Sequence, residues 1–462
     1  MDRPRDEAPP GRLVYVETYG CQMNVYDSAA IVGLLGAHGW RQTDDPDRAD
    51  ALLLNTCSVR EHAEHRVISR LGELRQRYAR DGRRALLGVC GCMAERLAGV
   101  LVQGRRIADL AVGVDQYDRL AELLEIALRA GPQEPAPIAI GHRGDAHYVA
   151  PPAANPANNS HLVTIHKGCD YRCTYCVVPL TRGPQREKAP EVILAEVAAV
   201  VAAGGVEVTL LGQNVTAYRC GEALDFAGLL ERVAAVPGLR RVRFLTGHPR
   251  DLSDRLLRAI GADPAICPWL HVPAQSGSDR VLKRMKRLYG RADYLRMVEK
   301  ARAWIPQVTF SGDFIVGFPG ETDADFRDTL ELVRGVGYDT IFSFKYSARP
   351  GTPAARLPDD VSQTTKRERL AALMAAQDEG WRQLAAAQVG QTVRAAVEAR
   401  ARRGAGWWRL RTTNNRKVVL PLRDGAVGQE HEVLITGFKD TTFLGEAAAG
   451  PRARRGDGSC GS

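Results

Sequence analysis

Three cysteines crowd into one short segment of the chain. The run GCDYRCTYC places Cys169, Cys173 and Cys176 in C-x3-C-x2-C spacing, directly after a stretch predicted as a strand. Cysteine thiolates are the ordinary ligands of iron-sulfur clusters, and three of them can hold three irons of a 4Fe-4S cube while the fourth iron stays open. The alternative is a zinc site that His166 could complete, but structural zinc closes its shell with four ligands. The spacing therefore favours a cluster.

Three further cysteines stand far apart in the sequence but at equivalent places. Cys21, Cys57 and Cys92 occur in TYGCQMN, NTCSVRE and GVCGCMAE, each at or just past the carboxyl end of a predicted strand. Ligands bind at that edge of open parallel sheets, so the three residues should converge on one point. The alternative is three buried structural cysteines, a common fate of this residue. Beside the first triplet, the pattern predicts a second three-cysteine cluster.

The remaining cysteines need an assignment as well. Cys90 and Cys92 are two residues apart and would face the same side of a strand. We assign Cys92 to the cluster, because it repeats the Gly-Cys pair at Cys21 and stands farther beyond the strand end. Three other cysteines lie outside any cluster spacing and are interpreted as structural or incidental: Cys220, Cys267 and Cys460.

Two strand-helix alternations must position these cysteines. Residues 11–129 alternate short apolar runs with helical patterns, which predicts an α/β domain with a parallel sheet. Residues 130–159 are rich in Pro, Ala, Asn and Gly, which is typical of a linker. Residues 160–389 contain six strand-helix units, fewer than the eight of a closed barrel. We therefore expect a partial (βα)6 TIM-like barrel whose site lies at the carboxyl ends of its strands.

The last part of the chain has a different pattern. A long helical stretch runs from Ser362 to about Gln388, and residues 390–450 then show short strands and turns that suit a small β-barrel. Residues 451–462 form a basic tail, and the charged, proline-rich residues 1–11 a second tail. We expect both tails to be disordered.

Composition narrows the class of protein. The chain has 462 residues, 63 Lys and Arg against 54 Asp and Glu, and a formal charge of +9, which favours a polyanionic partner. No apolar run is long enough to cross a bilayer, so we expect a soluble, cytoplasmic protein with no membrane contact. The ten cysteines then lie in a reducing compartment, where clustered thiols bind metal more often than they form disulfides.

The first triplet resembles the signature of the radical S-adenosylmethionine (SAM) superfamily, which has an aromatic residue before the last cysteine, here Tyr175. The resemblance implies that SAM binds the open iron through its methionine group. An electron from the reduced cluster then splits SAM and yields a 5′-deoxyadenosyl radical, which removes hydrogen from carbon. The protein supplies position and excludes water.

Both cysteine trios together resemble the methylthiotransferase family, and the resemblance covers nearly the whole chain. TYGCQMNVYDS, NTCSVREHAEHR, LLGQNV, HVPAQSGSDRVL and DFIVGFPGET occur in the family's order, and the terminal barrel looks like a TRAM domain. Gln22 and Met23 after the first cysteine are similar to the branch that modifies isopentenyladenosine in tRNA. The alternatives are the branches acting on threonylcarbamoyladenosine in tRNA or on a ribosomal-protein aspartate, which usually have Lys-Val and Pro-Lys there.

The resemblance implies cofactors, partners and a reaction. Two 4Fe-4S clusters and SAM would insert sulfur and a methyl group at carbon 2 of N6-isopentenyladenosine in a tRNA anticodon stem-loop. An external sulfur source and an external electron donor would replenish the sulfur and electrons that the reaction uses. We expect the enzyme to be a monomer. One loop departs from the family pattern Arg-Gly-x-Glu-x-Ser-Arg, because Arg182 and Gly183 are followed by Gln185, Glu187 and Lys188. Lysine lacks the bidentate fork of arginine, which leaves the function of this loop open.

Polar residues at the remaining strand ends are candidates for binding SAM. They are Gly212, Gln213, Asn214, Gln275, Ser276 and Asp313. SAM needs donors and acceptors for its amino, carboxylate, ribose and adenine groups at the mouth of the barrel. The alternative for each residue is an ordinary turn or helix cap.

The predicted terminal barrel is basic, with ten Lys and Arg against six Asp and Glu between Gln391 and Gly450. Trp407, Trp408 and Arg409 combine aromatic and cationic groups that suit stacking on unpaired bases and contact with phosphates. The alternative is a barrel whose tryptophans are core, and we expect that of one of the two. A rival of another class is a nonenzymatic RNA-binding protein with structural zinc.

Overall fold

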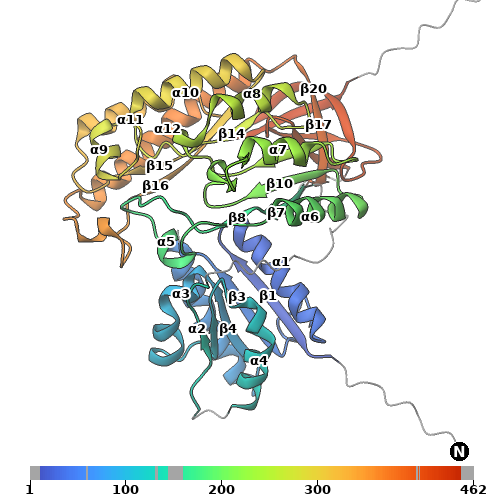
Figure 1. Cartoon of the computed structure of the whole chain (residues 1–462), viewed down its shortest axis with the longest axis vertical. Helices are drawn as coiled ribbons and strands as arrows, with labels where there is room; N and C mark the ends of the chain where they lie inside the picture. Colours follow the sequence, from blue (N-terminus) through green and yellow to red (C-terminus); the bar gives the residue numbers. More distant parts are fainter. Residues whose placement is uncertain are drawn as a thin grey trace, which may run out of the picture.

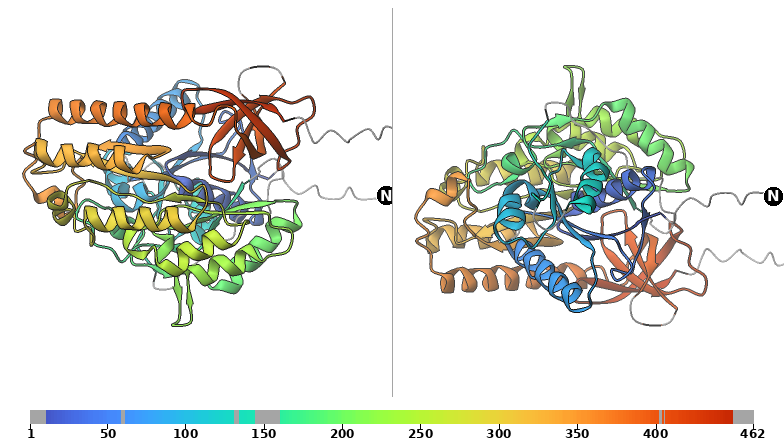
Figure 2. Two further views of the ribbon diagram at one scale, coloured as in Figure 1. Left: turned by 90° about the horizontal axis from the view of Figure 1, so that it is seen from above. Right: turned by 90° about the horizontal axis from the view of Figure 1, so that it is seen from below.

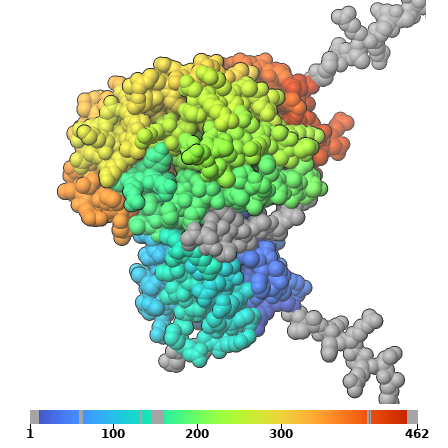
Figure 3. Space-filling view, in the orientation of Figure 1, coloured from blue at the N-terminus to red at the C-terminus, as the bar shows by residue number. Residues whose placement is uncertain are grey.

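The computed structural model describes residues 11–58, 61–130, 134–143, 160–401, 404 and 406–448. Three domains follow one another along the chain (Figure 1). The first (blue) forms a narrower lobe below the wider second domain (green to orange), as the space-filling view also shows (Figure 3). The predicted tails and most of the predicted linker lie outside the described residues, apart from Gly11, Ala130 and residues 134–143.

The first domain is the predicted α/β domain with a parallel sheet. Its strands, paired in the order β2-β1-β3-β4-β5-β6 and all parallel, are β1 (Leu13–Tyr19), β2 (Arg41–Gln42), β3 (Ala51–Thr56), β4 (Leu86–Gly91), β5 (Leu110–Val112) and β6 (Ile138–Ala139). Helices cover both faces, α1 (Gln22–Ala37) and α4 (Leu120–Arg129) on one, α2 (Glu61–Arg80) and α3 (Cys92–Ala98) on the other. Because Leu52 and Leu53 pack on opposite faces, β3 begins with an unbroken apolar run, Ala51 to Leu54.

Strand β6 was not predicted, because it lies in the stretch 130–159 that the composition marks as a linker. It pairs with β5 through Ala111–Ile138 and Val112–Ala139. A strand of two residues leaves no apolar period in the sequence. The ordered chain of the first domain therefore continues past the boundary expected at residue 129.

The second domain contains all six predicted barrel strands. They are β7 (Ser160–Thr164), β10 (Glu207–Leu211), β13 (Arg241–Phe244), β14 (Trp269–His271), β15 (Thr309–Val316) and β16 (Thr340–Lys345). They pair as β7-β10-β13 and β14-β15-β16, and a parallel bridge between Val242 and Ile266 joins the halves. Within the described residues β7 and β16 do not pair, so the barrel is open and the predicted partial barrel is confirmed.

Helices cover the outside of this barrel. They are α6 (Pro190–Ala202), α7 (Phe226–Ala234), α8 (Asp254–Ala262), α9 (Asp279–Arg284), α10 (Arg291–Trp304), α11 (Asp323–Val336) and α12 (Gln363–Ala386). The largest apolar core lies between these helices and the strands. Among the described residues no helix combines the length and apolar character needed to cross a membrane.

The third domain is a closed five-stranded barrel, ordered β17-β18-β19-β21-β20. Its strands are β17 (Thr392–Arg400), β18 (Trp407–Thr412), β19 (Lys417–Pro421), β20 (Glu430–Lys439) and β21 (Thr442–Ala447). The sequence predicts the first four. Strand β21 follows β20 after a turn at Asp440, which has a φ of 51°. The sequence did not predict this turn, because it contains neither glycine nor proline. The predicted long helix is α12, which runs alongside the partial barrel into the third domain (Figure 2).

This barrel packs against the amino ends of the partial-barrel strands. Arg243 at β13 bonds Glu207 of β10 and the carbonyls of Thr412 and Thr413 in the third domain. Arg416 of the third domain pairs with Asp339, just before β16. The third domain therefore lies at the end of the partial barrel opposite the strand ends that carry Cys169.

Candidate active site

The three cysteines of the first domain follow neighbouring strands in register. Tyr19, Thr56 and Gly91 lie side by side at the carboxyl ends of β1, β3 and β4. Cys21 comes two residues after Tyr19, Cys57 directly after Thr56, and Cys92 directly after Gly91. The structure therefore brings all three to one sheet edge, as the strand pattern predicts.

Two glycines make room for this arrangement. Gly20 has a φ of +149°, and a Cβ there would lie 2.5 Å from the Cβ of Cys57 and 2.4 Å from Oδ1 of Asn24. Gly91 has a φ of +90°, and its Cβ would meet Oδ1 of Asn55 at 2.5 Å. A side chain at either position would strain the backbone and push the cysteine loops apart.

Buried amides hold the first of these loops. Oδ1 of Asn24 accepts from the backbone N–H of Cys21 at 3.3 Å and from its thiol at 3.4 Å. Nδ2 of Asn24 donates to Oδ1 of Asn55 and to the carbonyl of Thr56. Asn55 in turn donates to Ser28 of α1. This network ties the strand ends to α1 and fixes where Cys21 stands.

Cys90 and Cys92 occupy different surroundings. Cys90 packs in the apolar core between the sheet and helices α1 and α4, and burial raises the pKa of its thiol to about 12. Cys92 lies beyond the strand as the first residue of α3, with Sγ 3.3 Å from Nε of Arg182. Of the two, Cys92 is therefore the one at the sheet edge with Cys21 and Cys57.

The thiols at this edge influence one another. A hydrogen bond with Cys57 lowers the pKa of Cys21 to about 6; the positive charge of Arg182 acts the same way, and burial opposes both. Burial raises the pKa of Cys92, and Arg182 opposes it. Iron binds thiolates, so a thiol poised to lose its proton beside a buried guanidinium fits the donor set of an iron-sulfur cluster.

Cys169, Cys173 and Cys176 lie on the loop after β8 (His166–Lys167), at the mouth of the partial barrel. Gly168 opens the loop with a φ of +79°, and a Cβ there would meet the carbonyl oxygen of Pro184 at 1.9 Å. The backbone N–H of Cys169 donates to the carbonyl of Gly183 at 3.1 Å. Nη1 of Arg287 donates to Sγ of Cys173 at 3.4 Å.

Burial raises the pKa of Cys169 to about 11 and that of Cys176 to about 12, and Cys173 interacts electrostatically with both. These thiols lose their protons when a metal binds. In the described part of the chain, no three His, Cys, Asp or Glu side chains form a group that could hold a metal ion as they stand. Thiolates on three different irons of one cube stand farther apart than the ligands of one ion.

The residues predicted after β10 turn out to support the cysteine loop. Gln213 accepts from the backbone N–H of Gly168 at 2.6 Å. Asn214 donates from its side chain to Asp251 at 2.6 Å and accepts from Thr216. A Cβ at Gly212 would lie 1.9 Å from Nε2 of His166, so the glycine makes room for that ring.

The other three candidates differ in how accessible they are. Ser276 is buried and lies 3.3 Å from the hydroxyl of Thr329. Gln275 bridges to β15 through its backbone with a φ of +69°. Asp313 is partly exposed, and its Oδ2 lies 3.6 Å from Nε2 of His271. Of these three side chains, that of Asp313 is placed to offer a carboxylate at the barrel mouth.

Sequence reasoning missed an aromatic cluster beside the triplet. Tyr171 lies within the cysteine loop and stacks on His248, with ring centroids 4.1 Å apart, and its hydroxyl donates to Asp251. The edge of His248 meets Tyr289, which accepts from Arg287. Burial and the charge of Arg287 lower the pKa of His248 and keep its ring neutral. No spacing in the sequence joins these positions, because they come from three separate segments of the chain.

The loop that departs from the family pattern, residues 182–188, joins the first two domains, and we name it the basic strap. Three of its cations reach the first domain: Arg182 bonds Asp27 at 2.6 Å, Arg186 bonds Asp115 at 2.6 Å, and Nζ of Lys188 donates to the Tyr26 hydroxyl at 3.2 Å. Gln185 bonds Glu187 within the strap. The altered residues are therefore used in contacts of this chain's own.

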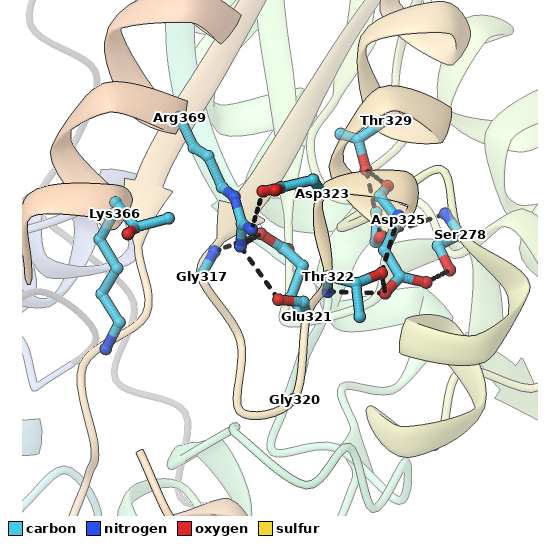
Figure 4. Close-up of polar contacts among 12 residues, drawn as sticks. Ser278, Gly317, Gly320, Glu321, Thr322, Asp323, Asp325, Thr329, Lys366 and Arg369 are labelled. Atoms are coloured by element: carbon cyan, nitrogen blue, oxygen red, sulfur yellow. Dashed lines mark hydrogen bonds and ion pairs between the residues drawn. The ribbon is translucent and has the colours of Figure 1, made fainter. Parts of the chain in front are cut away.

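The DFIVGFPGET run has a supporting role in the described contacts (Figure 4). Glu321 accepts from the backbone N–H of Gly317 and from Arg369 of α12, both at 2.8 Å. Thr322 caps α11 together with Asp325, which also accepts from Ser278 at 2.6 Å. These contacts fix α11 and α12 to the end of β15.

Family comparisons divide the chain in the same way as the fold. Residues 13–113 match the uncharacterized protein family UPF0004, and residues 163–333 match the radical SAM superfamily. Among solved structures, the radical SAM methyltransferase TsrM from Kitasatospora setae has a TM-score of 0.53 at 16% identity over 74% of this chain and 75% of that chain. The cobalamin-dependent SAM radical enzyme OxsB has a TM-score of 0.51 at 10% identity over 81% of this chain and 56% of that one. Both support the radical SAM fold.

Curated relatives extend over nearly the whole chain. A tRNA-2-methylthio-N(6)-dimethylallyladenosine synthase from Chromobacterium violaceum is 41% identical over 94% of this chain and 98% of its own. The proteins of the same name from Alkalilimnicola ehrlichii and Ralstonia pickettii are also 41% identical, over 94% and 95% of this chain and 97% and 98% of their own. With both cysteine trios in place at the strand ends, the chain belongs to the family of tRNA-2-methylthio-N(6)-dimethylallyladenosine synthases.

Proposed function

We propose that this protein inserts sulfur and a methyl group at carbon 2 of N6-isopentenyladenosine, next to the anticodon of a tRNA. The observation that supports this function is a pair of cysteine trios linked by one segment, residues 182–183, in a chain 41% identical to a tRNA-2-methylthio-N(6)-dimethylallyladenosine synthase. When bound, a reduced cluster with SAM would supply the radical that removes hydrogen from carbon 2, and a second cluster would carry the sulfur.

Each trio has a separate task in this proposal. Cys169, Cys173 and Cys176 hold the cluster that binds SAM, and the second trio holds an auxiliary cluster: Cys21, Cys57 and Cys92. The neutral Tyr171–His248 stack lies on the loop of the first trio, and the Arg287 guanidinium contacts Cys173. Asp313 would offer its carboxylate as an acceptor to a hydrogen-bond donor of SAM, since this acid is partly exposed.

The third domain would hold the RNA away from the chemistry. Trp407 is half-exposed and Trp408 lies in the barrel core, which leaves Trp407 as the aromatic residue that can stack on an unpaired base. The third domain packs at the end of the partial barrel that lies opposite its mouth. The tRNA would therefore extend along the protein from the third domain to the mouth of the partial barrel. The target base must leave its stack to enter, and loop bases do so at least cost.

We further propose that the enzyme works in the cytoplasm as a monomer, with an external electron donor and an external sulfur source. Each methylthio group leaves with the product, so one sulfur atom must be restored per turnover. The donors would meet the auxiliary trio at Cys21, which is exposed while Cys57 and Cys92 are buried.

The test is anaerobic reconstitution followed by incubation with SAM, a reductant and isopentenylated tRNA, with mass spectrometry of the nucleosides. We expect 2-methylthio-N6-isopentenyladenosine, and no product on the same tRNA without the isopentenyl group. Cys57→Ala should abolish this product yet still release 5′-deoxyadenosine, whereas the exposed Cys220→Ala should behave as wild type. Modification of threonylcarbamoyladenosine instead would refute the proposed substrate.

A further inference from the structure

Arg182 is a buried cation with an unfinished set of hydrogen bonds. Its side chain is 3% exposed, Nε lies 3.3 Å from Sγ of Cys92, and Nη2 lies 2.6 Å from Oδ2 of Asp27. Nη1 is buried and has no hydrogen-bond partner among the described residues. Burying a guanidinium with an unused donor is costly, so a further acceptor is expected beside it.

A second buried donor points to the same acceptor. The Tyr117 hydroxyl is buried and lacks a hydrogen-bond partner within the described part of the chain. Tyr117 packs in the same first-domain core as Cys90, two residues before Cys92, and the charges of Asp27 and Arg182 act on it. Two buried donors without partners, one of them on the guanidinium that contacts Cys92, suit an anionic group rich in sulfur.

We propose that Arg182 is a positioning residue that hydrogen-bonds the sulfur atoms of the auxiliary cluster and raises its reduction potential, and that Asp27 limits this effect. The inference rests on the proposed function, which puts a cluster on Cys21, Cys57 and Cys92. Hydrogen bonds to cluster sulfurs and nearby positive charge stabilise the reduced, more negative cluster, and a carboxylate nearby does the opposite.

The strap also links this residue to the other cluster site. The carbonyl of Gly183, next to Arg182, accepts from the backbone N–H of Cys169 at 3.1 Å. One peptide segment therefore contacts Cys169 through its backbone and Cys92 through a side chain. The segment whose side chain sets the reduction potential therefore also holds the two cysteine loops in a fixed relation.

The experiment uses the full-length chain with Cys169, Cys173 and Cys176 changed to alanine, so that the auxiliary cluster is the one present after reconstitution. Its midpoint potential is measured by redox titration followed by electron paramagnetic resonance. Arg182→Gln should shift the potential to more negative values and Asp27→Asn to less negative values. Lys188→Gln is the matched control, since its ammonium bonds Tyr26 and Glu196, and should leave the potential unchanged.

Opposite shifts in the two variants support the proposal, because a merely structural role would not give them opposite signs. Unchanged potentials, or shifts of the same sign, would overturn the role of Arg182 and leave the proposed function standing. If Arg182→Gln retains no iron, Arg182→Lys and Asp27→Asn test the proposal instead. Arg182→Lys should keep the midpoint potential near that of the parent, and Asp27→Asn should make it less negative. A parent protein that binds no iron would overturn the proposal together with the two-cluster function.

Discussion

The guanidinium of Arg182 in the second domain lies 3.3 Å from the thiol sulfur of Cys92 in the first, 90 residues away in the sequence. The surroundings of the first-domain trio are therefore completed by a side chain of its neighbour. Asp115, which pairs with Arg186 of the same strap, adds a second buried contact between these domains. The relative position of the two cysteine trios is thus fixed by ion pairs as well as by packing.

Gly20→Ala should remove the auxiliary cluster and leave the SAM cluster in place. The new Cβ would lie 2.5 Å from the Cβ of Cys57 and would need a φ of +149° that alanine rarely adopts. Iron per chain should fall from about eight to about four. Gly36→Ala in α1 is the control, because open space surrounds that position, and its iron content should equal that of wild type.

The two neighbouring tryptophans of the third domain should fail in different assays. Trp407→Ala should weaken tRNA binding about tenfold, since a lost stacking contact costs about 1–3 kcal/mol, with little change in stability. Trp408→Ala should destabilise the protein by about 3–5 kcal/mol, because that ring lies in the barrel core at 7% exposure. Filter binding and urea unfolding measure the two effects. Equal effects of both variants on binding would contradict the assignment of Trp407.

Arg243→Gln should detach the third domain from the partial barrel. The buried guanidinium bonds Glu207 and two carbonyls of the third domain. Its loss removes the closer of the two arginines beside the Glu207 carboxylate and leaves Arg241 at 3.8 Å, at a cost of about 1.5–3 kcal/mol. Limited proteolysis should then cut near residue 390. The exposed Arg255→Gln should change the unfolding free energy by less than about 0.5 kcal/mol. Equal stability of both variants would refute this docking contact.

The contact between the first two domains should weaken in acid. Asp115 is buried, which alone would raise its pKa, but His142, Arg186 and Lys167 outweigh burial and hold the pKa well below its usual range. A carboxylate whose pKa is lower in the folded than in the unfolded protein stabilises the fold at pH values above its unfolded pKa, near 4. This stabilisation is lost as the pH falls through its folded pKa. The Tm of wild type should therefore fall as the pH goes below about 4. The Tm of Asp115→Asn should be lower than that of wild type at pH 7 and should fall less in acid. The exposed Asp254→Asn should follow wild type; a wild-type acid slope in Asp115→Asn would contradict this role.

Strong local patterns made much of this fold predictable from the sequence. Apolar runs predicted the six strands of the partial barrel. The C-x3-C-x2-C spacing predicted one cysteine trio, and the positions of three cysteines at strand ends predicted the other. The short β6 left no period, and β21 followed a turn at Asp440 without a glycine. Arg182 and Arg287 reach cysteines from distant loops, and His248 stacks on Tyr171 within the cysteine loop. Their roles depend on tertiary contacts that no spacing along the chain records.

The two-cluster account is tested most directly by anaerobic iron and labile sulfide analysis of three full-length proteins. One is wild type, one lacks Cys21, Cys57 and Cys92, and one lacks Cys169, Cys173 and Cys176. The account predicts about eight, four and four of each atom per chain. Four in wild type, or zinc with no labile sulfide, would contradict it.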